Sequence, residues 1–344
     1  MEIYSSQSNQ CNQKILKYNG FAIAGHTVDL LDNELILIGD TSLGGKFKYI
    51  SIHSPRENLL AVKYSLETSN VKGSPYKHTS FRQGNKLTVL GGDQSPKARL
   101  DANVWTKINL QWKNQQVFSA FTSAACRIKL TKNKFLLIGG ISNDGKKEAR
   151  KNVLMINMAE DTVNELPSMN HARAHHSCEL LSGEDLIIIS GGTPQSPKTG
   201  TSTIDIVPDE VYSLKTGLSK TSSTAASLGR YQHRLIRLGK SVHALGGRNG
   251  SGQQSSIVEA FNEETRAWED QNNHLKSDQT GELAVTPFPL TAVDCVNGCK
   301  CGQAASSRVV NGTETQVNQS RNLVLRVFKI HFLSQILNPG WQLY

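Results

Sequence analysis

Apolar residues along the chain gather in short runs that end in glycine. Five such runs occur, and they are Glu34–Asp40, Lys86–Gly92, Lys134–Gly140, Asp185–Gly192 and Ser241–Gly247. A continuous apolar run of four or five residues, bounded by turn residues, is typical of a strand buried on both faces. The first glycines of the five runs lie 52, 48, 52 and 55 residues apart. The pattern therefore predicts five copies of one β-structured repeat.

A second marker keeps register with these glycines. Thirteen residues before them stand His26, His78, Cys126, Cys178 and His233, and His176 lies two residues before Cys178. A turn signal such as Gln83-Gly-Asn85 separates marker and glycine, so each repeat is expected to open with a β-hairpin. The fifth repeat also predicts a second hairpin. Its strands are Ser256–Phe261 and Arg266–Trp268, and its turn is Asn262–Thr265.

Four strands in about 50 residues, with two glycines closing the second strand, resemble the kelch repeat of β-propellers. The similarity covers roughly residues 24–275 and includes Val258–Trp268, which resembles the outer half of a kelch blade. It implies an all-β fold with a propeller over residues 24–289. The blade glycines are Gly39, Gly91, Gly92, Gly139, Gly140, Gly191, Gly192, Gly246 and Gly247.

Five blades are visible in the sequence, and one blade cannot bury its own faces. We therefore expect a ring of six blades or an incomplete ring, in which Ser277–Pro289 begins a sixth blade. The N-terminal segment 1–23 is a candidate closing strand.

The sequence changes character after Pro289. Cys295, Cys299 and Cys301 precede Arg308-Val309-Val310-Asn311-Gly312, and roughly residues 299–317 resemble the activation junction of a trypsin-like serine protease zymogen. The resemblance implies cleavage after Arg308, which frees the amine of Val309. The C-x3-C-x-C spacing does not match a zinc knuckle, so disulfides are the favoured state of the three cysteines.

Catalysis is not expected from this fragment, which we assign to residues 290–320. About 27 residues follow Val317, too few for the two barrels of the protease fold, and no Gly-Asp-Ser-Gly-Gly sequence occurs. Residues 321–344 stay unassigned: Leu323–Leu337 suits a short amphipathic helix or is non-native sequence from a truncated or mis-spliced transcript. We expect an irregular tail from about residue 290 that lies outside the propeller core.

The formal charge of +9 permits an anionic partner, but the basic residues are spread along the whole chain. No dense basic run with interleaved aromatic residues occurs, so we expect no nucleic-acid binding. No stretch approaches the roughly 20 apolar residues of a membrane span. The first residues lack the pattern of a signal peptide. The compartment stays open: extracellular if the protease-like fragment is meaningful and the true N-terminus is missing, otherwise cytoplasmic.

Two further motifs are candidates for a metal site and for glycosylation. His171-Ala-Arg-Ala-His175-His176 would suit a metal on a helix, but the repeat places it at the start of a strand, where successive side chains point to opposite faces. We therefore expect no metal and no cofactor. Asn249, Asn311 and Asn318 begin Asn-x-Ser/Thr motifs, which are glycosylation acceptors in a secreted protein.

A non-catalytic scaffold that binds a protein partner is the function that the sequence favours, because propellers present loops on a rigid ring. We expect the register residues to face one shared region; they are His26, His78, Cys126, His176 and His233. The alternative is the regulatory portion of a secreted trypsin-like serine protease whose catalytic domain is truncated from this chain. A kelch-type copper oxidase would need converging Tyr, Cys and His ligands, and no such set is found in order.

Overall fold

The computed structural model describes residues 77–83, 122–142, 148–183, 185–195, 203–221, 229–238 and 240–275, together with the strands given below that lie outside these ranges. All regular elements in these residues are β-strands. Within the same residues there is no helix long and apolar enough to cross a membrane.

The described strands form six antiparallel sheets of four strands each. Sheet 1 contains β3 (Thr27–Leu31), β4 (Glu34–Ile38), β5 (Lys46–His53) and β6 (Lys63–Lys72). Sheet 2 contains β7 (Thr79–Gln83), β8 (Lys86–Leu90), β9 (Ala98–Val104) and β10 (Leu110–Val117). Sheet 3 contains β11 (Cys126–Lys129), β12 (Lys134–Ile138), β13 (Val153–Asn157) and β14 (Thr162–Leu166).

Of the remaining three sheets, sheet 6 combines strands from the N-terminal and C-terminal parts of the chain. Sheet 4 contains β15 (Ser177–Leu180), β16 (Leu186–Ser190), β17 (Glu210–Ser213) and β18 (Ser219–Thr221). Sheet 5 contains β19 (Arg234–Leu238), β20 (Ser241–Leu245), β21 (Ile257–Asn262) and β22 (Ala267–His274). Sheet 6 contains β1 (Glu2–Ser5), β2 (Gln10–Gln13), β23 (Ala284–Pro289) and β24 (Leu323–Phe328).

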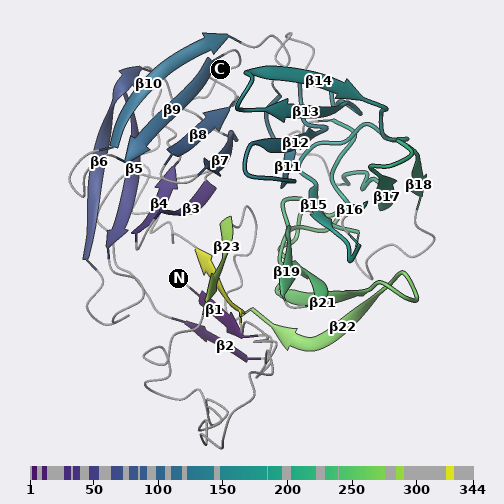
Figure 1. The fold of residues 1–344 in the computed structure, drawn as a ribbon. Coiled ribbons are helices and arrows are strands. Elements are labelled where there is room, and N and C mark those ends of the chain that lie inside the picture. The colour runs from purple at the N-terminus through teal and green to yellow at the C-terminus, as the bar shows by residue number, and fades with distance from the viewer. Residues whose placement is uncertain are drawn as a thin grey trace, which may run out of the picture.

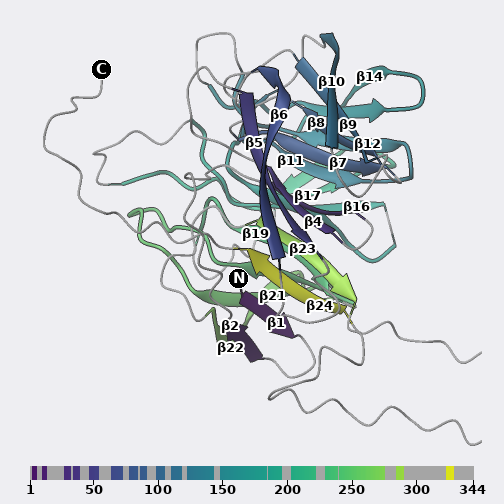
Figure 2. The same cartoon turned by 90° about the vertical axis from the view of Figure 1, so that its left-hand side faces the viewer.

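The six sheets stand around a common centre (Figures 1 and 2). One edge strand of each sheet faces the centre, and these strands are β3, β7, β11, β15, β19 and β23. Each contacts the corresponding strand of the sheets on both sides, and β23 contacts β3. We call these six strands the inner strands. The arrangement is that of a propeller-like all-β fold, as the repeated apolar runs predicted.

Sheet 6 corrects our view of the C-terminal tail. β24 pairs with β23, where Pro287 opposes Leu325, and with β1, where Ile3 opposes Arg326. The helix considered for Leu323–Leu337 is therefore wrong over Leu323–Phe328, and these six residues do not lie apart from the sheets. The physical reason is that β23 and β1 each leave an edge of unpaired backbone groups, which one more strand satisfies. The protease-like segment, with Arg308, lies outside the described residues.

The hydrophobic core lies between neighbouring sheets. Ile187, Ile188 and Ile189 of β16 are all fully buried, as predicted for a strand covered on both faces. Ile187 and Ile189 pack toward sheet 3, whereas Ile188 packs toward sheet 5. Because consecutive side chains of a strand point to opposite faces, one apolar run serves two interfaces.

The paired glycines explain how closely the sheets approach. Gly139 and Gly140 have φ of 61° and 95°, and Gly191 and Gly192 have φ of 58° and 89°, a region that favours glycine. A Cβ on Gly191 would stand 2.0 Å from the carbonyl oxygen of Arg230 in the next sheet. A Cβ on the second glycines would collide with the chain of their own sheet. Gly39, Gly91 and Gly92 lie outside the described residues.

Replacing Gly191 by alanine should lower the free energy of unfolding by about 3 kcal/mol or more, because backbone strain adds to overlap with Arg230. Gly183→Ala is the matched control, since Gly183 has φ of 97° but no atom within 4 Å of the added carbon. It should cost only the strain, about 1–2 kcal/mol. Urea unfolding of both variants checks this, and equal losses would contradict the close approach.

Deleting residues 290–344 should lower the melting temperature and promote aggregation, because it removes β24 and exposes the facing edges of β23 and β1. A chain that ends at residue 330 retains β24 and is the matched control. Calorimetry and light scattering compare the two chains. If both melt like the full chain, the pairing of β24 is wrong.

Candidate functional site

Five of the inner strands line a cavity of about 320 Å³ at the centre of the ring. Its lining comes from β3, β7, β11, β15 and β19 and the residues just before β7 and β11. Much of that lining is polar or charged, and includes His78, Thr79, Arg127, Glu179, Arg234 and Arg237. We refer to it as the central cavity, and it is the candidate site.

The strand pairing corrects the register that was read from the sequence. In each sheet, the residue just before the first glycine pairs across the first hairpin with one residue of the inner strand. From sheet 1 to sheet 5 these partners are Thr27, Thr79, Cys126, Ser177 and Arg234. The preceding position holds His26, His78, Ala125, His176 or His233. A fixed spacing of thirteen residues does not find these equivalent positions, because the hairpin connections differ in length. Residues 130–133 join β11 to β12 and residues 181–185 join β15 to β16, whereas the other first hairpins have connections of two residues. His26 itself lies outside the described residues.

A chain of backbone hydrogen bonds connects the sheets just before the inner strands begin. Lys77, Ala124, His175 and Gln232 all have left-handed backbones, with φ of 56°, 54°, 56° and 58°. The N–H of Ala124 donates to the carbonyl of Lys77, His175 to Ala124, and Gln232 to His175, at 3.0, 3.0 and 2.7 Å. The repeated conformation thus joins sheets 2, 3, 4 and 5 in series.

Two of the repeated histidines, His176 and His233, are packing residues. His176 and His233 are buried, and their rings lie beside Gly139 and Gly191 of the preceding sheet. Burial, with the nearby positive charge of Arg173 or Arg230, holds their pKa values well below the usual 6.5. Burial and Lys77 likewise lower the pKa of His175 to about 3. These rings are therefore neutral near pH 7.

The His171–His176 segment does not gather its three imidazoles. The Nδ1 of His171 lies 2.9 Å from Glu210, whereas His176 packs against Gly139. The described part of the chain contains no group of three or more His, Cys, Asp or Glu side chains able to hold a metal ion.

Side chains also link the inner strands of sheets 1, 2 and 3 across the cavity wall. Thr27 Oγ1 lies 2.8 Å from His78 Nε2. Arg127 donates to Ser80 Oγ at 2.7 Å and pairs with Asp29 at 3.5 Å, and Ser80 donates to Asp29 as well. One guanidinium therefore connects three sheets.

A disulfide joins Cys126 of β11 to Cys178 of β15, with 5.9 Å between the Cα atoms, within the usual range for such bonds. Disulfides were expected in the Cys295–Cys301 cluster, which lies outside the described residues, and the pairing of Cys126 with Cys178 was not predicted. The separation of 52 residues is one repeat. Neighbouring copies of the repeat place their inner strands side by side, so distance along the chain did not mean distance in space.

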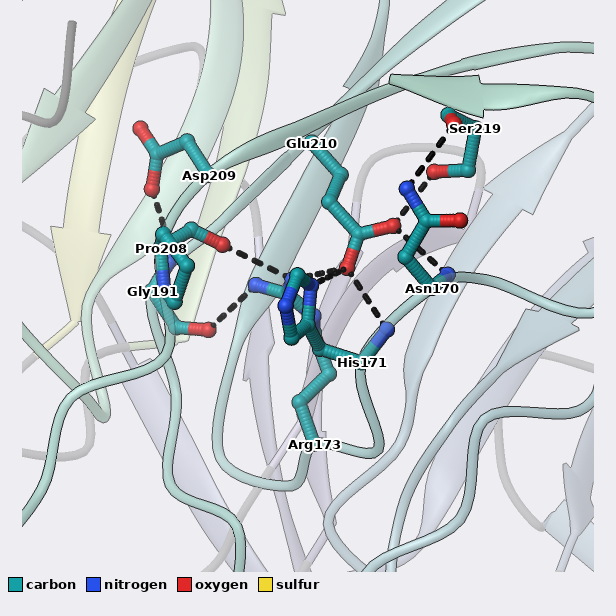
Figure 3. A network of polar contacts seen from close by, with 8 residues as sticks. All are labelled: Asn170, His171, Arg173, Gly191, Pro208, Asp209, Glu210 and Ser219. Atoms are coloured by element: carbon teal, nitrogen blue, oxygen red, sulfur yellow. Dashed lines mark hydrogen bonds and ion pairs between the residues drawn. The ribbon is translucent and has the colours of Figure 1, made fainter. Parts of the chain in front are cut away.

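Glu210 organises a buried polar network in sheet 4 (Figure 3). It pairs with Arg173, and both side chains are fully buried. Backbone N–H groups of Asn170 and His171 donate to Glu210 at 2.9 and 3.0 Å, and the Ser219 hydroxyl donates to it as well. Burial opposes ionisation, but these donors and the Arg173 charge outweigh it, so the pKa of Glu210 is lowered.

The same pair recurs in sheet 5 as Arg230 and Glu259. Each arginine also caps the first glycine of its own sheet: Arg173 donates to the carbonyl of Gly191 at 2.8 Å, and Arg230 to that of Gly246 at 2.9 Å. Neither pair was predicted from the sequence. The signal was an arginine three residues before a histidine, as in Arg173 and His176 or Arg230 and His233.

Asn249 is the glycosylation candidate within the described residues. Its side-chain oxygen accepts the backbone N–H groups of Ser251 and Gln253 at 3.1 and 2.9 Å. The side chain thus closes a turn on the surface of sheet 5.

Glu210→Gln should lower the free energy of unfolding by about 3 kcal/mol, because it leaves the buried Arg173 without its counter-charge. Glu263→Gln is the matched control, since the Arg237–Glu263 pair is 26% and 19% exposed and should cost less than about 1 kcal/mol. Chemical denaturation measures both, and similar costs would argue against the buried network.

The free energy of unfolding should fall as the pH drops below about 6.5. Histidines of the unfolded chain then bind protons, whereas His175, His176 and His233 of the folded protein stay neutral. Each contributes a slope of about 1.4 kcal/mol per pH unit until its folded pKa is reached. Burial raises the pKa values of Glu179 and Asp209, which opposes this loss at acidic pH.

The double variant His176→Asn/His233→Asn isolates the histidine contribution. Its unfolding free energy should fall less steeply between pH 6.5 and 5 than that of the unchanged chain. Parallel slopes in urea titrations would show that these histidines titrate normally.

Scanning the chain against protein-family models gives no match, and a search of curated proteins gives no significant match. The fold is similar to the solved structure of YjhT, with a TM-score of 0.59 over 75% of this chain and 86% of YjhT. The two sequences are 14% identical, so the likeness is one of fold alone.

Proposed function

We propose that the chain is a kelch-type β-propeller of six blades that acts as a non-catalytic protein-interaction scaffold. The central cavity carries this proposal, because five rigid inner strands present polar side chains to one space. Recognition sites need such a set of fixed polar groups within a concave surface. The buried arginine–glutamate pairs and the disulfide hold that surface in place.

Sheet-by-sheet differences support selective recognition. At the structurally equivalent position the wall carries Thr79 in sheet 2, Ser177 in sheet 4 and Arg234 in sheet 5. A partner that inserts a side chain into the cavity would meet hydroxyls on one side and a guanidinium on another. Such unequal walls select one orientation of a bound segment.

The Cys126–Cys178 disulfide favours a second candidate, the regulatory portion of a secreted trypsin-like serine protease. Structural disulfides persist in oxidising compartments, where zymogens of that class act. We propose no hydrolytic activity for this chain in either case. A purified chain cleaved after Arg308 should not hydrolyse a peptide ester once the cleaving enzyme is removed, and turnover would refute this.

The scaffold proposal is tested with two variants of equal charge change, Arg234→Glu in the cavity wall and Lys220→Glu on the exposed strand β18. Proteins from the source cells are cross-linked to each purified chain and quantified by mass spectrometry. A specific partner should be retained by Lys220→Glu and lost by Arg234→Glu. Equal retention by both, with unchanged melting temperatures, would rule out recognition through the central cavity.

A further inference from the structure

The Cys126–Cys178 disulfide lies at the wall of the central cavity. Both cysteines belong to the cavity lining, together with Arg127, Ser177 and Arg234. Each residue is only 4% exposed, so a large protein cannot approach the bond from outside. The cavity of about 320 Å³ falls in the size range of small-molecule pockets, roughly 300–1,000 Å³.

The surroundings suit the two thiols as well as the disulfide. Cys126 Sγ lies 3.7 Å from the carbonyl oxygen of Cys178, and Cys178 Sγ lies 3.9 Å from that of Arg127. In the reduced protein each S–H therefore has an acceptor already in place. A buried thiol with an acceptor carries a smaller desolvation penalty than one without.

The interface between sheets 3 and 4 does not depend on the disulfide alone. Around the two cysteines pack buried apolar side chains from both sheets, including Ile128, Ile138, Ile187 and Ile189. Backbone bonds from His175 to Ala124 and from Gly140 to the carbonyl of Arg173 also cross this interface. Breaking one S–S bond therefore leaves the two sheets packed against each other.

We propose that Cys126–Cys178 is a thiol-exchange site that small thiols reach through the central cavity while the protein stays folded. A thiolate of the small thiol attacks one sulfur, a mixed disulfide forms, and the other cysteine leaves as a thiolate that takes up a proton. A second small thiol attacks the mixed disulfide. The products are two protein thiols and one small-molecule disulfide, so two electrons pass from the two small thiols to the protein.

Access through the cavity gives this site reduction kinetics different from those of an ordinary buried disulfide. An ordinary one reacts only when the fold opens, so its reduction rate reaches a ceiling at the opening rate whatever the thiol concentration. A bond that small thiols reach from the cavity would instead react in proportion to the thiol concentration. It also discriminates by size, because the cavity admits a small thiol but not a polymer.

The test uses the full oxidised chain. Peptide mass spectrometry first establishes the Cys126–Cys178 linkage. Native protein is then incubated with 2-mercaptoethanol at increasing concentration, or with thiol-terminated polyethylene glycol of about 5 kDa chosen to exceed the pocket range, and trapped with iodoacetamide. Labelling is read only from the peptides that carry Cys126 and Cys178, so the other cysteines do not interfere. Circular dichroism follows the fold in the same samples.

We expect labelling by 2-mercaptoethanol to rise linearly with its concentration, at least tenfold faster than with the polymer, while the β-sheet spectrum is unchanged. A mixed disulfide on Cys126 or Cys178 should be detected early. A rate that levels off at the measured unfolding rate, or equal rates for both thiols, would overturn the proposal. So would the absence of the Cys126–Cys178 linkage in the oxidised chain.

Discussion

Where sheets 3, 4 and 5 meet, the contact that sets their spacing is the one between a glycine pair and the arginine segment of the next sheet. The N–H of Gly140 donates to the carbonyl of Arg173, and that of Gly192 to the carbonyl of Arg230, at 2.9 and 3.0 Å. Only glycine leaves room for a carbonyl at that distance and accepts the positive φ at low cost. Adjacent sheets therefore meet backbone to backbone, and the rest of each interface is fixed by this approach.

The arginine makes this contact specific. Its carbonyl accepts from the preceding sheet, while its guanidinium donates to the first glycine of its own sheet and pairs with a buried glutamate. Each buried charge would be costly alone, but the pair is surrounded by further donors. The Arg173–Glu210 and Arg230–Glu259 pairs thus act as positioning elements that hold two successive glycine turns in register.

Sheet 3 shows how the same task is met with other residues. Thr122 stands at the arginine position and donates its hydroxyl to the carbonyl of Gly139 at 2.7 Å. Ala125 stands at the histidine position, so this sheet lacks both the guanidinium and the buried imidazole. The disulfide of Cys126 lies at this sheet. It crosses to sheet 4, at an interface that also retains His176 beside Gly139 and the hydrogen bond from Gly140 to Arg173.

The sequence predicted the repeated part of the fold because buried strands and glycine turns are local features. Ile187–Ile189 and the glycines of sheets 3 to 5 needed no tertiary information. The position of Cys178 beside Cys126 did, since only the ring sets the inner strands of sheets 3 and 4 side by side. Leu323–Phe328 was missed for a related reason: its apolar and basic residues fit a helix as well as a strand, and only the free edges of β1 and β23 decide between them.

The residues that repeat most regularly are the least suited to recognition. His176 and His233 are enclosed by glycine turns and kept neutral, so they hold the sheets together and offer nothing to a partner. The position that follows each histidine varies instead, and it carries Thr79, Ser177 or Arg234 at the cavity wall. Interface residues of a repeat fold are constrained by the neighbouring repeats, whereas its inner lining is freer to differ. For the proposed scaffold, selectivity would therefore come from the variable lining, while the repeated histidines and glycines hold the sheets together.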